Sequence, residues 1–276
     1  MMGWFSRFWR KRKKVVVVRL QGAISAGGGL RPGLSAEALE ERLVKAFSRK
    51  PAAVALAINC PGGSPVQSAL IAKRIRQLAE EKKVPVLAYV EDVAASGGYW
   101  LATAADEIHA EAASIIGSIG VVSAGFGFTK ALGKLGIERR VYSAGKNKVV
   151  LDPFQPEKPE DVARLKALQA DIHELFKRQV IARRGRKLKQ SDKELFTGAF
   201  WTAGKALELG LIDGIADMTG HLKTRFGADV VIERMREKQG FLARRMQLNS
   251  AGIAHDSVEA LAQAAELRAL WSRFGL

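Results

Sequence analysis

The sequence predicts an α/β fold with a central, mostly parallel sheet flanked by helices. Three runs dominated by Val, Leu, Ile and Ala, at residues 15–20, 53–59 and 85–90, are too short for helices and are typical of buried strands. Segments with helical spacing of apolar residues separate them, at residues 35–47 and from 65 to about 82. Because strands that alternate with helices usually form parallel sheets, we expect this arrangement over the first hundred residues.

The ends of the two helices carry their own signals. Ser35 and Ser64 are expected to cap them, since a serine oxygen accepts a hydrogen bond from an unpaired amide of the first turn. Pro65 suits the first helical position, and Pro51 ends the preceding helix.

The second half of the chain is expected to be less regular. Extended pieces are predicted at residues 107–110, 115–123, 137–142 and 230–233, with a long amphipathic helix from 160 to about 184 and a shorter one stopped by Gly210. The basic stretch 183–189 is interpreted as a solvated turn. We divide the chain into a tail (1–14), a folded domain (15–237) and a C-terminal helical extension (238–276) that has no evident packing partner in the core.

Positive charge is concentrated in two segments. Of the formal net charge of +16, the tail contributes +6 and residues 158–193 a further +6. Such an excess attracts polyanions, and charge alone does not separate nucleic acid from anionic lipid. In the tail, Trp4, Phe5, Phe8 and Trp9 interleave with the cations, a pattern typical of an interfacial membrane anchor. We therefore expect peripheral membrane contact and no nucleic-acid partner; a basic tail without a role is the alternative.

Several other classes of protein are disfavoured. No stretch reaches the roughly eighteen to twenty apolar residues that cross a bilayer, so we expect a cytoplasmic protein, held at most peripherally on the inner face of the cell membrane. A single cysteine, Cys60, excludes an intrachain disulfide. The four histidines show no His-Glu-x-x-His spacing, and we expect no metal and no cofactor.

Ser96 is the candidate nucleophile. It lies in Ala95-Ser96-Gly97-Gly98, between the strand at 85–90 and an Ala-rich helix, and so on a strand-to-helix turn. Unpaired backbone amides are available at such a turn, and the glycines allow a substrate backbone to approach closely. The alternative is that Ser96 is only a helix cap.

A second glycine loop, at Gly62-Gly63, follows the preceding strand. Both loops leave the same edge of a parallel sheet, so their amides can converge on one point and form an oxyanion hole. A phosphate cradle is the competing interpretation, but neither of its two common glycine motifs occurs.

A serine nucleophile needs a base, and no histidine is placed by motif to serve. A lysine can serve if burial favours its neutral amine. Lys148 is a candidate beside an apolar segment, but spacing alone does not separate it from Lys146, Lys134 or Lys130.

Five motifs, in order along residues 15–217, resemble the signal peptide peptidase A family of serine proteases, peptidase family S49. They are Asn59-Cys60-Pro61-Gly62-Gly63, Ala95-Ser96-Gly97-Gly98-Tyr99, Gly117-Ser118-Ile119-Gly120-Val121, Ser143-Ala144-Gly145-Lys146-Asn147-Lys148 and Gly210-Leu211-Ile212-Asp213. The resemblance implies a ClpP/crotonase-like fold.

The resemblance also implies roles for particular residues. Ser96 matches the nucleophile, Lys148 the general base and Ser118 a serine that orients that lysine. The substrate-binding glycines are Gly62, Gly63, Gly97 and Gly98, with Gly97 and one of the Gly62-Gly63 pair matching the oxyanion donors. Two positions depart from the family pattern: Cys60 stands where serine is usual, and Val149 where an acidic residue is usual.

The implied activity is that of a serine endopeptidase that cleaves unfolded, signal or membrane-derived peptides through an acyl-enzyme. Family members form rings or domes, which implies a homo-oligomer. The alternative is a crotonase-type acyl-CoA enzyme, or a catalytically silent scaffold on the same fold.

Overall fold

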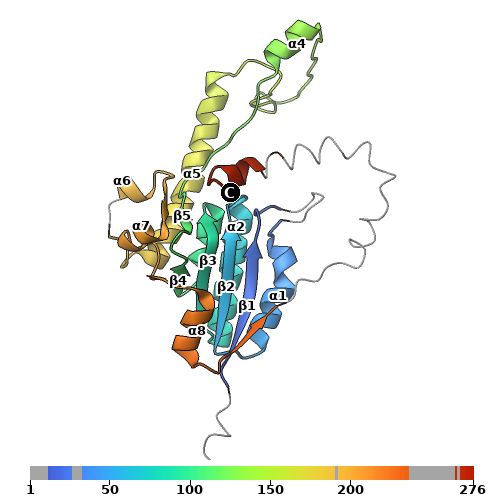
Figure 1. Ribbon diagram of the computed structural model, residues 1–276. Helices are drawn as coiled ribbons and strands as arrows, with labels where there is room; N and C mark the ends of the chain where they lie inside the picture. The colour runs from blue at the N-terminus through green and yellow to red at the C-terminus, as the bar shows by residue number, and fades with distance from the viewer. Residues whose placement is uncertain (1–11, 27–32, 190–191, 236–264, 266–267) are drawn as a thin grey trace, which may run out of the picture.

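The predicted α/β fold with a central, mostly parallel sheet is confirmed. The computed structural model describes residues 12–26, 33–189, 192–235, 265 and 268–276. Within this part of the chain, eight strands form one sheet in the order β6-β5-β3-β2-β1-β8, with β4 paired to β3 and β7 paired to β4 (Figure 1). The described pairings are parallel except that of β5 with β6.

β1, β2, β4 and β8 begin and end close to their predicted limits, whereas β3 extends five residues further than predicted and β6 and β7 were not predicted as strands. Their bounds are β1 (Lys14–Gln21), β2 (Ala53–Cys60), β3 (Val86–Ala95), β4 (Glu107–Ala110), β5 (Ile115–Gly117), β6 (Phe200–Thr202), β7 (Gly214–Ile215) and β8 (Val231–Arg234). Every residue of β2 is buried, which explains why its sequence is continuously apolar rather than alternating.

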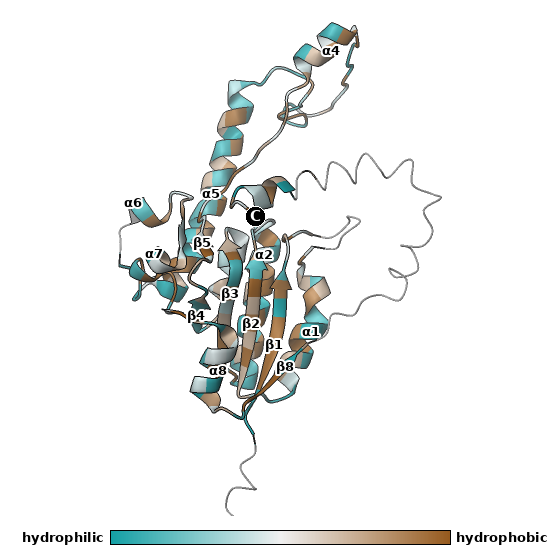
Figure 2. Cartoon of the chain, in the orientation of Figure 1, coloured by the Kyte–Doolittle hydropathy of each residue, from teal (hydrophilic) through white to brown (hydrophobic). Residues whose placement is uncertain are grey.

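Helices cover both faces of this sheet. Their bounds are α1 (Ala36–Ser48), α2 (Pro65–Lys82), α3 (Gly97–Ala102), α4 (Thr129–Leu135), α5 (Pro159–Arg184), α6 (Asp192–Leu195), α7 (Ala203–Glu208) and α8 (Met218–Phe226). Val16 and Val18 share a core cluster with residues of α1 and α2, whereas Val15 and Val17 share one with Leu222 of α8. This alternation is the period of two expected of a strand, and Figure 2 shows the apolar strands between helices of mixed hydropathy.

Both predicted helix caps are confirmed. The Ser35 hydroxyl oxygen accepts a hydrogen bond from the Ala38 amide at 3.2 Å, and that of Ser64 from the Gln67 amide at 3.4 Å. Pro65 is the first residue of α2.

A long arm, residues 120–158, projects away from the sheet and contains α4 (Figure 1). The predicted strand at 137–142 is wrong, and the one at 115–123 is shortened to β5. Residues 120–123 and 137–142 lie on the arm, where no described sheet edge is available to pair with them; Ile137 is 54% and Tyr142 is 91% exposed. Such a cluster of exposed apolar side chains is typical of an interaction surface.

The interpretation of residues 183–189 as a solvated turn is also wrong at its first two residues. The Arg184 side chain is 3% exposed, donates to the Asp213 carboxylate at 2.6 Å and donates twice to the Gly210 carbonyl. Arg183 donates to the carbonyls of Thr103 and Ala105 at 2.9 Å each. Both arginines are therefore structural, because α5 ends against the segment after α3 and the Gly210–Asp213 turn rather than in solvent.

The Gly210–Asp213 motif ties several elements together. Besides the bonds from Arg184, the Leu211 carbonyl accepts a bond from the buried Tyr99 hydroxyl at 2.8 Å, and Asp213 accepts one from the Ile108 amide at 2.8 Å. Gly210 has a φ of +80°, and a Cβ there would lie 1.8 Å from the Lys187 carbonyl oxygen. The motif thus joins α5, α3 and β4 at a position that only glycine fits.

The C-terminal residues 268–276 have a packing partner, contrary to our expectation. Phe274 packs against Val93 and Ala95 of β3, and its ring lies 5.2 Å from that of Phe200. The rest of the predicted helical extension up to residue 264, and most of the N-terminal tail, lie outside the described residues. The proposed domain boundaries stay predictions.

Candidate active site

Ser96 is the single residue between β3 and α3. β3 ends at Ala95, α3 begins at Gly97, and Ser96 has φ 52° and ψ −124°. Its side chain forms no capping hydrogen bond with α3, so the interpretation of Ser96 as a simple helix cap is wrong. A positive φ is uncommon for a residue with a side chain and marks a strained turn of the kind that active sites use.

The two glycine loops meet at this serine, as their place on the sheet predicts. A Cβ on Gly62 would lie 2.8 Å from the Cβ of Ser96 and 2.9 Å from the Gly97 nitrogen, and Gly62 itself has a φ of +108°. Any side chain at Gly62 would therefore displace Ser96.

The neighbouring glycines allow other close contacts. A Cβ on Gly98 would lie 2.1 Å from the Cys60 carbonyl oxygen, so Gly98 lets α3 pack on the β2 loop. A Cβ on Gly63 would lie 2.1 Å from the Ile24 carbonyl oxygen, because the segment after β1 runs alongside this loop. Ile24 contributes to the site without any motif that could have marked it in the sequence.

Two backbone amides of the glycine loops have no described acceptor and are candidates for an oxyanion hole. Among the described residues, the Ile24 and Ser64 amides are used in the bridge between the loops, and the Gly62 amide is directed to the Cys60 thiol. The Gly63 and Gly97 amides donate to no described hydrogen bond, and Gly97 is in the first turn of α3, where helical acceptors are lacking.

Cys60 is a structural residue. Burial raises the pKa of its thiol to about 12, although the hydrogen bond from the Gly62 amide acts in the opposite direction. The thiol is thus protonated at neutral pH and is not a competing nucleophile. The cysteine in place of the family's usual serine leaves the loop glycines in position.

A backbone hydrogen bond connects Ser96 to Gly117, the residue before Ser118. The Ser96 amide donates to the Gly117 carbonyl at 2.8 Å, and the Ser118 amide donates to the Ala199 carbonyl at 2.7 Å. Ser118 is 4% exposed and also has a φ of 52°. Two serines in the left-handed region therefore follow adjacent strands β3 and β5.

The lysines are not brought to this point within one chain. Lys148 is exposed on the arm, and its amide bonds the Gly145 carbonyl at 3.1 Å. Lys146, Lys134 and Lys130 are exposed on the same arm. Within the described residues, Ser96 and Lys148 share no hydrogen bond, so the predicted pairing stays a prediction.

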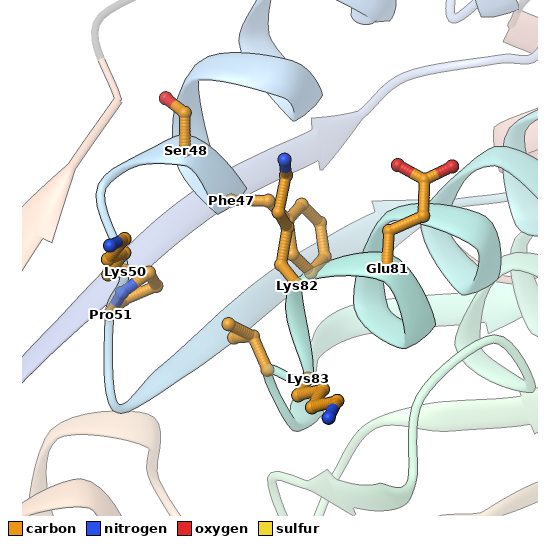
Figure 3. A pocket seen from close by; sticks show the side chains of 8 residues that line it. Phe47, Ser48, Lys50, Pro51, Glu81, Lys82 and Lys83 are labelled. Carbon is orange, nitrogen blue, oxygen red and sulfur yellow. The ribbon is translucent and has the colours of Figure 1, made fainter.

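A cavity of about 440 Å³ lies at the other end of the sheet. It is formed where α1 and α2 end, just before β2 and β3 begin (Figure 3). Lys50, Lys82 and Lys83 line it together with Ser48 and Glu81, and none of the residues around Ser96 contributes to it.

Comparison with known proteins agrees with this geometry. The family model described as peptidase family S49 matches residues 78–225. A putative protease of Synechocystis is 34% identical over 73% of this chain and 69% of its own length, and the chloroplastic serine protease SPPA of Arabidopsis thaliana is 33% identical over 75% of this chain and 31% of its own. Both relatives are described as proteases. The chain belongs to peptidase family S49.

Two further similarities, to one curated protein and to one solved structure, say less about the function of this chain. A protein of Brucella melitensis named Na(+)/H(+) antiporter NhaA is 50% identical over 98% of this chain. The match covers only 38% of the length of that protein, so most of the protein that carries this name has no counterpart here. A mutant of the membrane-bound stomatin-specific protease 1510-N has the same fold, with a TM-score of 0.50, 16% identity and coverage of 82% of this chain and 98% of its own. No helix of the described residues has the length and apolar character needed to cross a membrane.

Proposed function

We propose that this protein is an endopeptidase with a Ser96–Lys148 dyad. The observation that carries the proposal is the convergence of the strained Ser96, the Gly62-Gly63 loop and Ser118 at one edge of the sheet. Ser96 Oγ attacks the substrate carbonyl carbon as its proton passes to the lysine amine. The oxyanion is held by the Gly63 and Gly97 amides. The amine then returns the proton to the leaving nitrogen, and water hydrolyses the acyl-enzyme.

The arm is the part of the molecule that must complete this site. A lysine acts as a base only when neutral, which burial favours, and Lys148 is exposed here. Val122, Phe126 and Leu135 on the same arm are 64%, 80% and 70% exposed. Burial of these side chains against another copy would stabilise a homo-oligomer and enclose Lys148. The base is then supplied either by the same chain's arm or by a neighbour's.

Mixing two inactive variants separates these routes. If the dyad forms between copies, Ser96→Ala and Lys148→Ala proteins, unfolded and refolded together, should regain about a quarter of wild-type peptidase activity on an unfolded fluorogenic protein, since some sites combine an intact serine with an intact lysine. Each variant refolded alone is the control. No recovery from a mixed oligomer would assign both residues to one chain.

The proposed substrates are unfolded, signal or membrane-derived peptides. Glycines around Ser96, namely Gly62, Gly63 and Gly97, favour a narrow pocket, and Ala94 and Ala95 before it are fully buried. The competing function, an acyl-CoA enzyme or silent scaffold, would use the same amides without a nucleophile. Trapping an acyl-enzyme on Ser96 with a peptide ester, detected as a mass increase lost in Ser96→Ala, favours the peptidase.

We also propose that residues 1–14 hold the protein peripherally on the cytoplasmic face of the cell membrane. Four aromatic residues supply apolar contact, and six cations each contribute on the order of 1 kcal/mol near an acidic surface. Co-sedimentation with anionic vesicles should therefore be strong at low salt, weak at high salt, and lost without the tail. Equal binding to neutral vesicles, or binding unchanged by truncation, would contradict this assignment.

A further inference from the structure

Two histidines and a glutamate gather where α8 crosses β4, away from Ser96. Glu107 and His109 are two residues apart on β4, so their side chains lie on the same face of the sheet. His221 belongs to α8. The imidazole rings of His109 and His221 have centroids 4.0 Å apart, and the His109 Nε2 lies 3.3 Å from the Glu107 carboxylate. Residues more than a hundred positions apart form this cluster, so no local spacing could have revealed it.

The cluster has the dimensions of a metal site. One nitrogen of each imidazole and one oxygen of Glu107 all lie within 4.8 Å of one another. Three such atoms fit within a circle of radius about 2.8 Å, and zinc ligands lie at about 2.0–2.2 Å, so each side chain needs to move by less than about 1 Å. His109 is 8% exposed, and its Nδ1 has no described hydrogen-bond partner.

One ring nitrogen of His221 already has a hydrogen-bond partner. The Tyr89 hydroxyl lies 2.8 Å from the His221 Nδ1. A hydrogen bond at one ring nitrogen fixes the tautomer and leaves the other nitrogen for a metal. His221 and Glu107 are partly exposed, which leaves an entry path and room for a water ligand.

An arginine side chain already pairs with one of the three residues of the cluster. The Arg225 guanidinium binds the Glu107 carboxylate. Arg225 itself is exposed, so its side chain is free to turn into solvent when a dication arrives.

We propose that His109, His221 and Glu107 bind one Zn²⁺ with water as the fourth ligand. Two imidazoles and one carboxylate are a donor set that suits zinc and disfavours magnesium, which prefers oxygen ligands. Tyr89 pairs with His109 across β3 and β4, and Ser96 lies seven residues further along the chain, roughly 20 Å away at strand rise. The ion would join α8 to the sheet rather than take part in peptide cleavage.

The test is calorimetric titration of untagged full-length protein with Zn²⁺, with Mg²⁺ as the comparison metal. We expect one zinc per chain, no magnesium binding, and a visible absorption band typical of tetrahedral geometry when Co²⁺ is used instead. His221→Ala and Glu107→Gln should weaken zinc binding at least tenfold, and Tyr89→Phe should weaken it about tenfold through the ring orientation.

Two further variants make the test specific. Arg225→Gln should strengthen zinc binding, because it removes the competitor for Glu107, whereas a merely structural ion pair would give no such gain. His173→Ala, which removes a histidine from α5, is the matched control and should bind zinc as the wild type does. Absence of stoichiometric binding in the wild type, or equal affinity in His221→Ala, would overturn the proposal. If His221→Ala fails to fold, by circular dichroism, the Arg225→Gln and Tyr89→Phe affinities decide.

Discussion

Replacement of Ser96 by alanine should lower peptide cleavage by about 10⁴-fold or more while leaving the fold intact, because nucleophile and base act as a unit. Lys148→Ala should cause a loss of similar size. Ser96 carries the hydroxyl group of the Ala95-Ser96-Gly97-Gly98 turn, and alanine at a φ of 52° retains the Cβ that already packs there. Steady-state hydrolysis of an unfolded fluorogenic protein measures the loss, and circular dichroism checks the fold.

Lys146→Ala is the matched control for the base. Lys146 lies two residues from Lys148, is also exposed on the arm and carries the same charge. The Lys146→Ala variant should retain substantial peptidase activity, since the proposed mechanism uses only the amine of Lys148. Full activity in Lys148→Ala, or equal losses in both lysine variants, would remove Lys148 from the dyad and leave another group as the base.

Much of the fold could be predicted because it depends on local patterns. The buried strands β1, β2 and β3 each contain a run of four or more apolar residues, and Ser35 and Ser64 cap α1 and α2 as their positions indicate. The meeting of the two glycine loops at Ser96 follows from parallel strands alone, since such strands end at one edge of the sheet.

The remaining features depend on contacts between distant residues. A charged segment such as 183–189 is usually solvated, and nothing local shows that Arg184 is covered by the Gly210–Asp213 turn. The arm has apolar residues at spacings that also suit strands, but no described edge pairs with it. The roles of Ser118 and Lys148 came from family resemblance rather than from spacing. The histidine cluster spans β4 and α8, elements whose packing the sequence does not predict.

The Arg184–Asp213 pair explains why the Gly210–Asp213 motif matters for folding. Burial would raise the pKa of Asp213, but hydrogen bonds from Arg184 and Lys187 outweigh it and hold the pKa below its usual value. The two partners differ in exposure: the Arg184 side chain is 3% exposed and that of Lys187 is 45% exposed. The buried partner should therefore dominate the stability that Asp213 contributes.

Asp213→Ala should lower the free energy of unfolding by about 3–5 kcal/mol, because it leaves the Arg184 charge buried without its counter-ion and the Ile108 amide without its acceptor. Lys187→Ala removes only the exposed partner of the same carboxylate and should cost less than about 1 kcal/mol. Urea unfolding, followed by tryptophan fluorescence and by circular dichroism, measures both variants against the wild type. If the two variants are equally stable, Arg184 is already satisfied by the Gly210 carbonyl alone, and the carboxylate of this motif has a role other than stabilising the fold.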